Sequence, residues 1–123
     1  MTNFIYDQTT GHLWQDGQRI GRGYSGRGVG LNNPEYQFSR NLGPIPVGVW
    51  KLGKAQEHPR LGPLAIALEP MMENQTGGRS GFFIHGDNPK GDNSASQGCI
   101  VLPRKVRERI AASSVKGLVV VAS

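Results

Sequence analysis

Short apolar segments alternate with polar, glycine-rich turns along most of the chain. Residues 4–7 have the length and composition of a short strand. Residues 12–15 and 18–24 flank Asp16-Gly17, a pair typical of the two-residue turn that closes a β-hairpin. We therefore predict a strand followed by a hairpin at the start of the chain.

The middle of the chain contains more continuous apolar runs. Residues 47–52, 64–68 and 82–84 have the pattern of buried strands, and the second run is apolar throughout, which favours a central place in a sheet. Residues 25–46, by contrast, contain too much Gly, Asn and Pro for regular structure. We expect a long surface loop there, with at most a short helix near residues 35–40.

A helix is predicted only near the end of the chain. Pro103 suits the first turn of a helix, and Val106 and Ile110 form an apolar pair four residues apart. We expect this helix to end near Ser113, and residues 118–121 to form a last strand.

Composition supports the same fold class. The chain has 123 residues, of which 18 are Gly and 8 are Pro, and this favours tight turns over long helices. The length predicts a single domain over residues 1–123. The expected fold class is mainly β (β-rich α+β), with one or two short helices.

The net charge narrows the classes of partner. There are 14 Lys and Arg against 9 Asp and Glu, a formal charge of +5, which favours an anionic partner such as nucleic acid, lipid head groups or an acidic wall polymer. Residues 1–7 lack a basic segment followed by a long apolar one, and no run approaches the roughly 18 apolar residues of a membrane span. We expect synthesis in the cytoplasm without a standard export signal.

The single cysteine stands in the stretch with the most chemistry. Cys99 follows Gly98 in a polar turn, and His85 ends a predicted strand 14 positions earlier (99 − 85). A thiol nucleophile needs a base within reach and small neighbours, and Gly98 leaves room for a substrate carbonyl. Backbone N–H groups around Gly98 and Cys99 are candidates for an oxyanion hole. From the residues alone, however, a buried inert thiol fits equally well.

Metal binding is disfavoured by spacing. Cys99 and His85, together with the distant His12 and His58, form no recognisable set of ligands, and one thiolate is few for a structural zinc site. We expect no metal and no other cofactor.

Several stretches resemble a known family. His85-Gly86 followed by Ser96-Gln97-Gly98-Cys99-Ile100 resembles the active-site signature of the L,D-transpeptidase (YkuD-like) domain, and residues 43–50 are similar to that family's strand entry. Over residues 4–122 the chain looks like the short type VI secretion L,D-transpeptidase effectors. The departures are Gln97 and Val101, where many L,D-transpeptidases have His and Arg. Similar stretches also include residues 23–26, Asn33-Pro34, 41–46, 78–82 and Leu102-Pro103.

This resemblance implies an L,D-transpeptidase-like β-sandwich or barrel and a peptidoglycan-modifying cysteine enzyme. Cys99 would attack the carbonyl of the third residue of a stem tetrapeptide, a diamino acid, with His85 as its base, and release D-alanine. Water would complete L,D-carboxypeptidase trimming of the thioester. A D-amino acid would give exchange, and a second stem a cross-link.

Other residues receive roles from the same resemblance. Ser96 is expected to hydrogen-bond the catalytic imidazole or to hold the loop, and Gly86 to give its neighbours room. Asp87 is expected to pair with a free amine of the substrate or to cap a turn. Arg79 and Arg104 are candidates for the carboxylates of the stem, because a guanidinium offers a bidentate fork.

The implied biology is that of an antibacterial effector injected into the periplasm of a competitor. Its expected partners are peptidoglycan stem peptides, D-amino acid acceptors, a cognate immunity protein and a component of the secretion apparatus. We expect a monomer without nucleic-acid or membrane partners. Three alternatives stay open: a catalytically inactive basic module that binds cell wall or nucleic acid, a housekeeping L,D-transpeptidase, and a different Cys–His hydrolase such as a papain-like amidase. The order of His85 before Cys99 counts modestly against the last of these.

Overall fold

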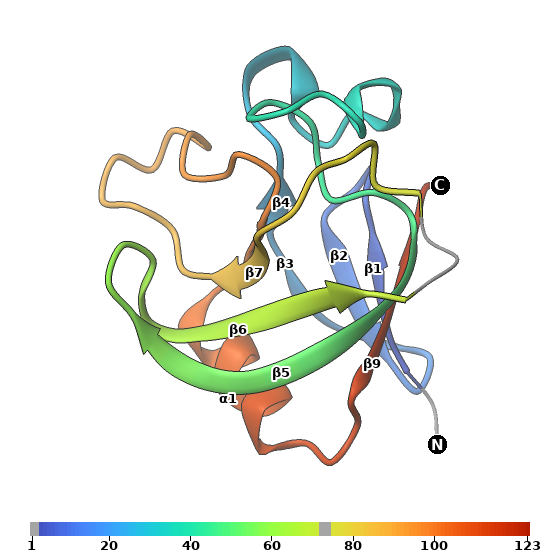
Figure 1. Ribbon diagram of the computed structural model, residues 1–123. Coiled ribbons are helices and arrows are strands. Elements are labelled where there is room, and N and C mark those ends of the chain that lie inside the picture. Colours follow the sequence, from blue (N-terminus) through green and yellow to red (C-terminus); the bar gives the residue numbers. More distant parts are fainter. Residues whose placement is uncertain (1–2, 72–74) are drawn as a thin grey trace.

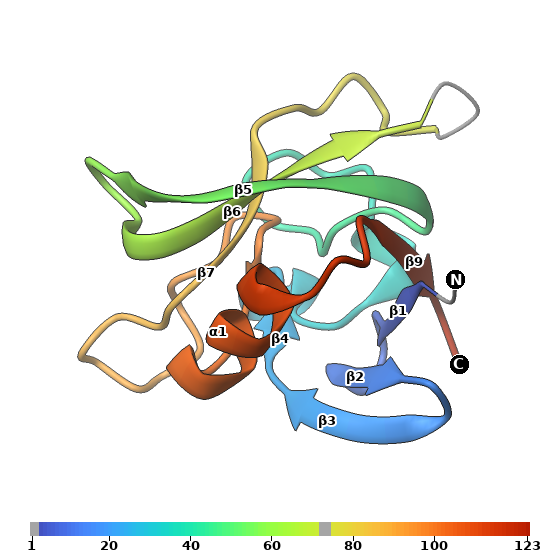
Figure 2. The same ribbon diagram turned by 90° about the horizontal axis from the view of Figure 1, so that it is seen from below.

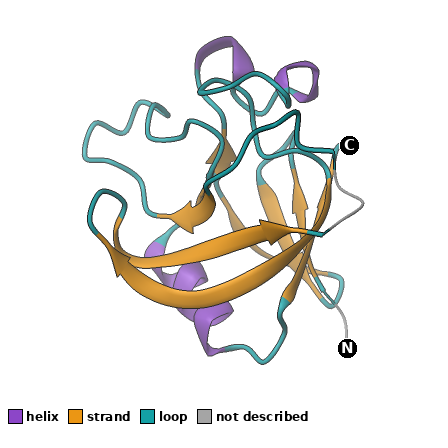
Figure 3. Cartoon of the chain, viewed as in Figure 1, coloured by secondary structure: helices purple, strands orange, loops and turns teal. Residues whose placement is uncertain are grey.

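Within the residues that the structure describes, nine strands form one strongly curved sheet in the order β3-β2-β1-β9-β5-β6-β7-β8-β4 (Figure 1). The computed structural model describes residues 3–71 and 75–123. In that part of the chain there is one α-helix, so the expectation of a mainly β fold is confirmed (Figure 3). The strands are β1 (Phe4–Asp7), β2 (His12–Gln15), β3 (Gln18–Arg22), β4 (Tyr24–Ser25), β5 (Gly48–His58), β6 (Gly62–Pro70), β7 (Phe82–His85), β8 (Ile100–Val101) and β9 (Gly117–Val121), and the helix is α1 (Arg104–Ala112).

The predicted hairpin is confirmed, but its second strand is shorter than expected. Asp16 and Gly17 close β2 and β3 with φ values of 51° and 78°, the left-handed values that a type I′ turn requires. The strand ends at Arg22, and the chain resumes as β4 at the opposite edge of the sheet. Only Gly23 separates the two edges, so the sheet is nearly closed. A Cβ at Gly23 would lie 1.7 Å from the carbonyl oxygen of Val101, which explains the glycine.

The hairpin of β5 and β6 is much longer than the apolar pattern predicted. The two strands form the long curved arm of Figure 1, and β5 continues to His58 although its apolar alternation ends near Leu52. Backbone pairing with β6 continues across two irregularities, down to His58 opposite Gly62. The ladder therefore extends past the core, and its outer end carries polar side chains to one side of the molecule.

The core fills the concave side of the sheet. Tyr6, Trp50, Ile84 and Ile100 are fully buried in it, and Trp50 packs edge-to-face on Phe82 with ring centroids 5.0 Å apart. Burying aromatic side chains of this size is a major source of stability. In Figure 2, α1 lies in the space between the β5–β6 hairpin and the strands β1 to β3.

Helix α1 confirms the predicted apolar pair. Val106 and Ile110 face the core, and the helix ends at Ala112, next to the expected boundary. The predicted loop is also confirmed over residues 26–46, which contain only two short 3-10 turns, η1 (Gly28–Gly30) and η2 (Pro34–Tyr36), whereas Ser25 belongs to β4. None of the described helices is long and apolar enough to cross a bilayer.

Candidate active site

Cys99 lines a cleft of about 670 Å³. The cleft lies where the ends of β5, β7 and β8 meet the loops that precede or follow them. The cleft is formed by the outer end of the β5–β6 hairpin, by the segment before β7 and by the loop before β8. The charged or titratable residues in its wall are Arg40, His58, Arg60, Arg79, His85 and Cys99. The cleft therefore brings together the predicted nucleophile, the predicted base and a second histidine.

The position of Cys99 follows from the pairing of β7 with β8. These strands run parallel, with Ile84 opposite Ile100, so Phe83 lies beside Cys99 just before β8 begins. The backbone N–H of Phe83 donates to Sγ of Cys99 at 3.3 Å. A main-chain donor at the end of the ladder thus points at the sulfur, where it stabilises negative charge.

His85 presents one ring nitrogen as a base. Its Nδ1 lies 2.8 Å from the carbonyl oxygen of Gly86. A carbonyl only accepts, so Nδ1 carries the proton and Nε2 keeps its lone pair. Because side chains two residues apart on a strand share a face, His85 lies on the same face as Phe83 and Cys99. Among the described contacts, none joins the imidazole directly to the sulfur.

His58 presents the opposite tautomer. Its Nδ1 accepts the backbone N–H groups of Arg60 at 3.1 Å and of Leu61 at 3.2 Å, so its proton resides on Nε2. The ring packs edge-to-face on Phe83, with centroids 5.0 Å apart. His58 is therefore a hydrogen-bond donor in this cleft and not a base. Sequence reasoning missed it, because no local signal reveals that the end of β5 curls back over β7.

Burial determines the protonation states of Cys99 and His85. Burial raises the pKa of the Cys99 thiol, and the Phe83 N–H and the positive charges of Arg79 and Arg60 only partly offset this. Burial also lowers the pKa of His85, and the bond to Gly86 partly offsets that shift. At neutral pH the site therefore contains a neutral thiol and a neutral imidazole instead of a preformed ion pair.

Ser96 holds the loop of the nucleophile. Its Oγ donates to the carbonyl of Cys99 at 2.6 Å and accepts the N–H groups of Gly98 at 3.1 Å and of Gly26 at 2.9 Å. Of the two expected roles, the structure shows the loop anchor and not a bond to His85. In this structure the N–H of Gly98 is engaged by Ser96, so it is not free to serve in the oxyanion hole predicted from the sequence around Gly98 and Cys99.

Arg79 fixes the same turn from the other side. Its two terminal nitrogens donate to the carbonyls of Gln37, Gly43, Pro44 and Gln97, and its guanidinium lies over the ring of Phe82. The side chain is only 8% exposed. Its fork is therefore not free for a carboxylate, contrary to the sequence prediction, and Arg79 supplies position and positive charge instead.

Gly98 is required by this packing. Its φ of +139° lies in the region that favours glycine, and a Cβ there would lie 2.2 Å from Nη2 of Arg79. The sequence explains Gly98 by the room that a substrate needs. The close contact of Gly98 with Arg79 is a second reason for a glycine at this position.

Three of the predicted substrate-binding residues lie outside the wall of this cleft. Asp87 accepts the hydroxyl of Tyr24 at 2.7 Å, and Arg104 pairs with Glu108 at 3.2 Å. Gly86 does leave room as expected, because a Cβ there would lie 2.6 Å from Nη2 of Arg107. Asp87 and Arg104 both line a second cavity instead.

In the described part of the chain, no group of three or more His, Cys, Asp or Glu side chains is arranged to hold a metal ion. The polar side chains in the cleft described above are instead those that thiol chemistry uses: a sulfur, a basic imidazole, a donor imidazole and nearby guanidinium groups.

Comparison with known proteins assigns a family to this arrangement. No curated protein matches the chain. The family model of the Tlde1 domain matches residues 19–122, which include every cleft residue discussed above. The chain therefore belongs to the Tlde1 domain family, an L,D-transpeptidase-like family of type VI secretion effectors.

Proposed function

We propose that this protein is a cysteine enzyme that removes or exchanges the terminal D-alanine of peptidoglycan stem tetrapeptides. The observation that carries the proposal is the cleft in which the Cys99 sulfur, with a main-chain donor on it, shares a wall with an imidazole whose Nε2 is unprotonated. Membership of an effector family with an L,D-transpeptidase-like character supports the choice of substrate.

In the first half-reaction, Nε2 of His85 accepts the thiol proton as Sγ of Cys99 forms a bond to the carbonyl carbon of the third residue. The tetrahedral adduct collapses, the C–N bond to D-alanine breaks, and His85 returns the proton to the departing amine. The products of this step are free D-alanine and a thioester on Cys99. Because the thiol is neutral at rest, proton transfer and attack are coupled.

In the second half-reaction, an acceptor opens the thioester. Water loses a proton to His85, its oxygen bonds to the carbonyl carbon, and the C–S bond breaks to regenerate the thiol, which gives trimming. A D-amino acid reacts through its amine in the same way and gives exchange, and a second stem gives a cross-link. Each route returns both Cys99 and His85 to their initial protonation states.

The adduct carries a negative oxygen that needs donors. With the N–H of Gly98 engaged by Ser96, we assign this role to the N–H of Cys99 and to Nε2–H of His58. His58 suits the task because its tautomer is set by two backbone donors and needs no rearrangement when charge develops.

The biological role that we propose is that of an antibacterial effector. The protein would be injected, act as a monomer on the wall in the periplasm of a target cell, and be restrained in the producing cell by an immunity protein. Loss of D-alanine removes the donor stems that ordinary cross-linking enzymes need. The family supports secretion by the type VI apparatus, and the basic surface suits an acidic polymer.

The enzymatic claim is tested by incubating the intact protein with purified muropeptide tetrapeptides and following D-alanine by mass spectrometry. We expect release from the intact protein and none from Cys99→Ala. A trapped acyl-enzyme of the corresponding mass is expected at early times. Absence of D-alanine release from the folded, intact protein would overturn the proposal.

A further inference from the structure

A second cavity has a volume of about 450 Å³. It is lined in part by the loop between β7 and β8, which also lines the cleft of Cys99. The loop between β7 and β8 contributes Ser94 and Ala95 to the cleft of Cys99, whereas it contributes Asp87 and Asn93 to this second cavity. No residue in the described part of the chain lines both cavities. The charged side chains in the second wall are Arg22, Asp87, Arg104 and Arg107.

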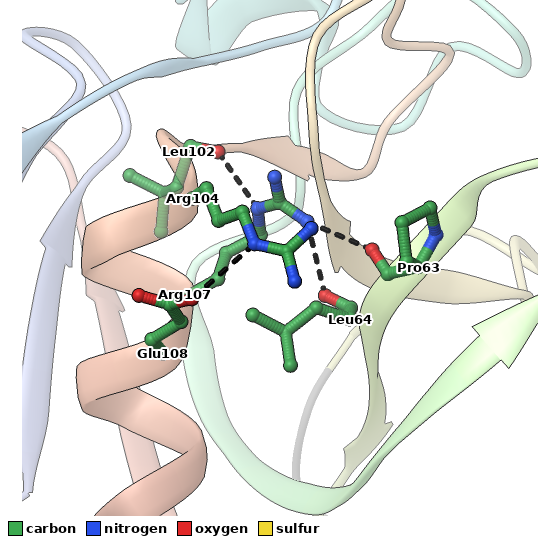
Figure 4. Close-up of polar contacts among 6 residues, drawn as sticks. All are labelled: Pro63, Leu64, Leu102, Arg104, Arg107 and Glu108. Carbon is green, nitrogen blue, oxygen red and sulfur yellow. Dashed lines mark hydrogen bonds and ion pairs between the residues drawn. The ribbon is translucent and has the colours of Figure 1, made fainter.

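Arg107 is a buried cation that the charge of Glu108 attracts, but Glu108 forms its ion pair with Arg104 and not with Arg107. Arg107 is 8% exposed, and its Nε donates to the carbonyl of Leu102 while Nη1 donates to those of Pro63 and Leu64 (Figure 4). Nη2 makes no hydrogen bond to any described residue, and no carboxylate in the described chain forms an ion pair with this guanidinium. A buried charge is costly unless it is paired, so this one favours a bound anion.

Two further arginines converge on the same cavity. Arg22 comes from the end of β3 and Arg104 from the first residue of α1. Figure 4 shows Arg104 beside Arg107, paired with Glu108 of the same helix, and this pair is exposed, so solvent screens it and a ligand can compete for the guanidinium. The first turn of α1 contains no acidic residue and no side-chain cap, so the positive end of its dipole adds to the attraction for an anion.

Asp87 places a negative charge in the wall of this positive cavity. The Tyr24 hydroxyl and the N–H of Asn88 both donate to Oδ1 of Asp87, and the Tyr24 oxygen in turn accepts the N–H of Ala95. The carboxylate is thus held in a fixed position. A simple dianion would be repelled by Asp87, whereas a head group with one carboxylate and one ammonium satisfies the arginines and Asp87 together.

We propose that this second cavity binds a zwitterionic amino-acid head group, with its carboxylate on the arginines and its ammonium on Asp87. Free amino acids and the side-chain end of 2,6-diaminopimelic acid in a stem peptide share this chemistry. The assignment of the stem peptide as the natural source rests on the proposed function. Binding there would hold a substrate peptide against the loop that joins His85, at the end of β7, to Cys99.

The test uses the full-length Cys99→Ala protein in isothermal titrations, so that no turnover occurs. The probes are 2,6-diaminopimelic acid and D-alanine, with pimelic acid and cadaverine as analogues that carry only one kind of charge. We expect saturable binding of diaminopimelic acid and at least about tenfold weaker binding of both analogues, because each lacks half of the charge pattern. If D-alanine binds as tightly as diaminopimelic acid, free amino acids are the natural ligand. If D-alanine binds more weakly, the natural ligand is the side chain of a stem peptide.

Matched variants locate the binding. Arg104→Gln and Arg22→Gln should each weaken it by about tenfold. Arg109→Gln removes the same charge from the same helix, but Arg109 contacts Gln15 and does not line the cavity, so it should have no effect. The proposal would be overturned if all three variants bound diaminopimelic acid equally well. It would also be overturned if pimelic acid bound as tightly as the zwitterions, or if no saturable binding were found.

The outcome is distinguishable from that of the proposed function. If the intact protein releases D-alanine but no zwitterion binds, only the proposal of a second binding site is excluded. Binding that depends on Arg104, combined with no D-alanine release, retains the second site and removes the enzymatic proposal.

Discussion

The backbone N–H of Phe83 donates to Sγ of Cys99 at 3.3 Å, at the point where the parallel pairing of β7 with β8 begins. If β8 began one residue earlier, a main-chain carbonyl would accept the N–H of Phe83. The sulfur of Cys99 accepts it instead. The donor is therefore positioned by the sheet itself, and it partly compensates for the burial of the thiol.

The first prediction concerns the ionisation of Cys99. Because burial raises its pKa, alkylation by iodoacetamide should be slow at neutral pH and should accelerate through an apparent pKa above the ordinary thiol range. Arg60→Gln removes one of the charges that favour the thiolate, so it should shift the profile to still higher pH. The pH dependence of the alkylation rate, followed by mass spectrometry, measures both effects.

The control for this prediction is Arg40→Gln, which removes an equal charge from the wall of the same cleft. Arg40 is not among the groups that shift the Cys99 pKa, so its profile should match that of the unmodified protein. A profile centred below the ordinary thiol pKa would contradict the prediction.

The second prediction concerns the pH dependence of D-alanine release. Only the neutral imidazole of His85 can accept the thiol proton, and burial lowers the pKa of this residue below its usual value of about 6.5. The value of kcat/KM should therefore rise with pH through an apparent pKa below 6.5 and be independent of His85 protonation at neutral pH. An acidic limb centred above 7 would show that His85 is not the base.

The third prediction separates the two histidines of the cleft. His58→Phe removes the Nε2–H donor but keeps a ring to pack on Phe83, so kcat should fall on the order of a hundredfold with little change in KM. His58→Gln retains a donor and should recover part of that loss. Steady-state kinetics on a tetrapeptide substrate measures the effect, and a His58→Phe enzyme with unchanged kcat would exclude the assigned role.

The fourth prediction concerns the anchor of the nucleophile loop. Ser96→Ala leaves the buried N–H groups of Gly26 and Gly98 without their acceptor, which should cost about 1–3 kcal/mol in the free energy of unfolding. Ser94→Ala, in the same loop but bonded to the exposed Asp92, should change it by less than about 0.5 kcal/mol. Urea unfolding compares the two, and equal losses would contradict the anchoring role.

Local patterns predicted the elements well wherever a local cause determines them. Asp16-Gly17 identified the first hairpin because a type I′ turn needs left-handed backbone at both positions. Val106 and Ile110 identified α1 because a helix repeats every 3.6 residues. The extension of β5 to His58 was missed because backbone pairing with β6, and not side-chain burial, maintains the strand there.

By itself, the sequence determined the mainly β class, the short strand that ends in His85 and the place of Cys99 after a glycine in a polar turn, since each depends on residues close together in the chain. Only the tertiary structure decided which groups surround the thiol. It brought His58 over Phe83, used the fork of Arg79 on backbone carbonyls, and moved Asp87 and Arg104 into a second cavity. Those contacts join segments far apart in the chain, and the energy that selects them arises from burying a shared core and satisfying buried polar groups, which no local pattern encodes.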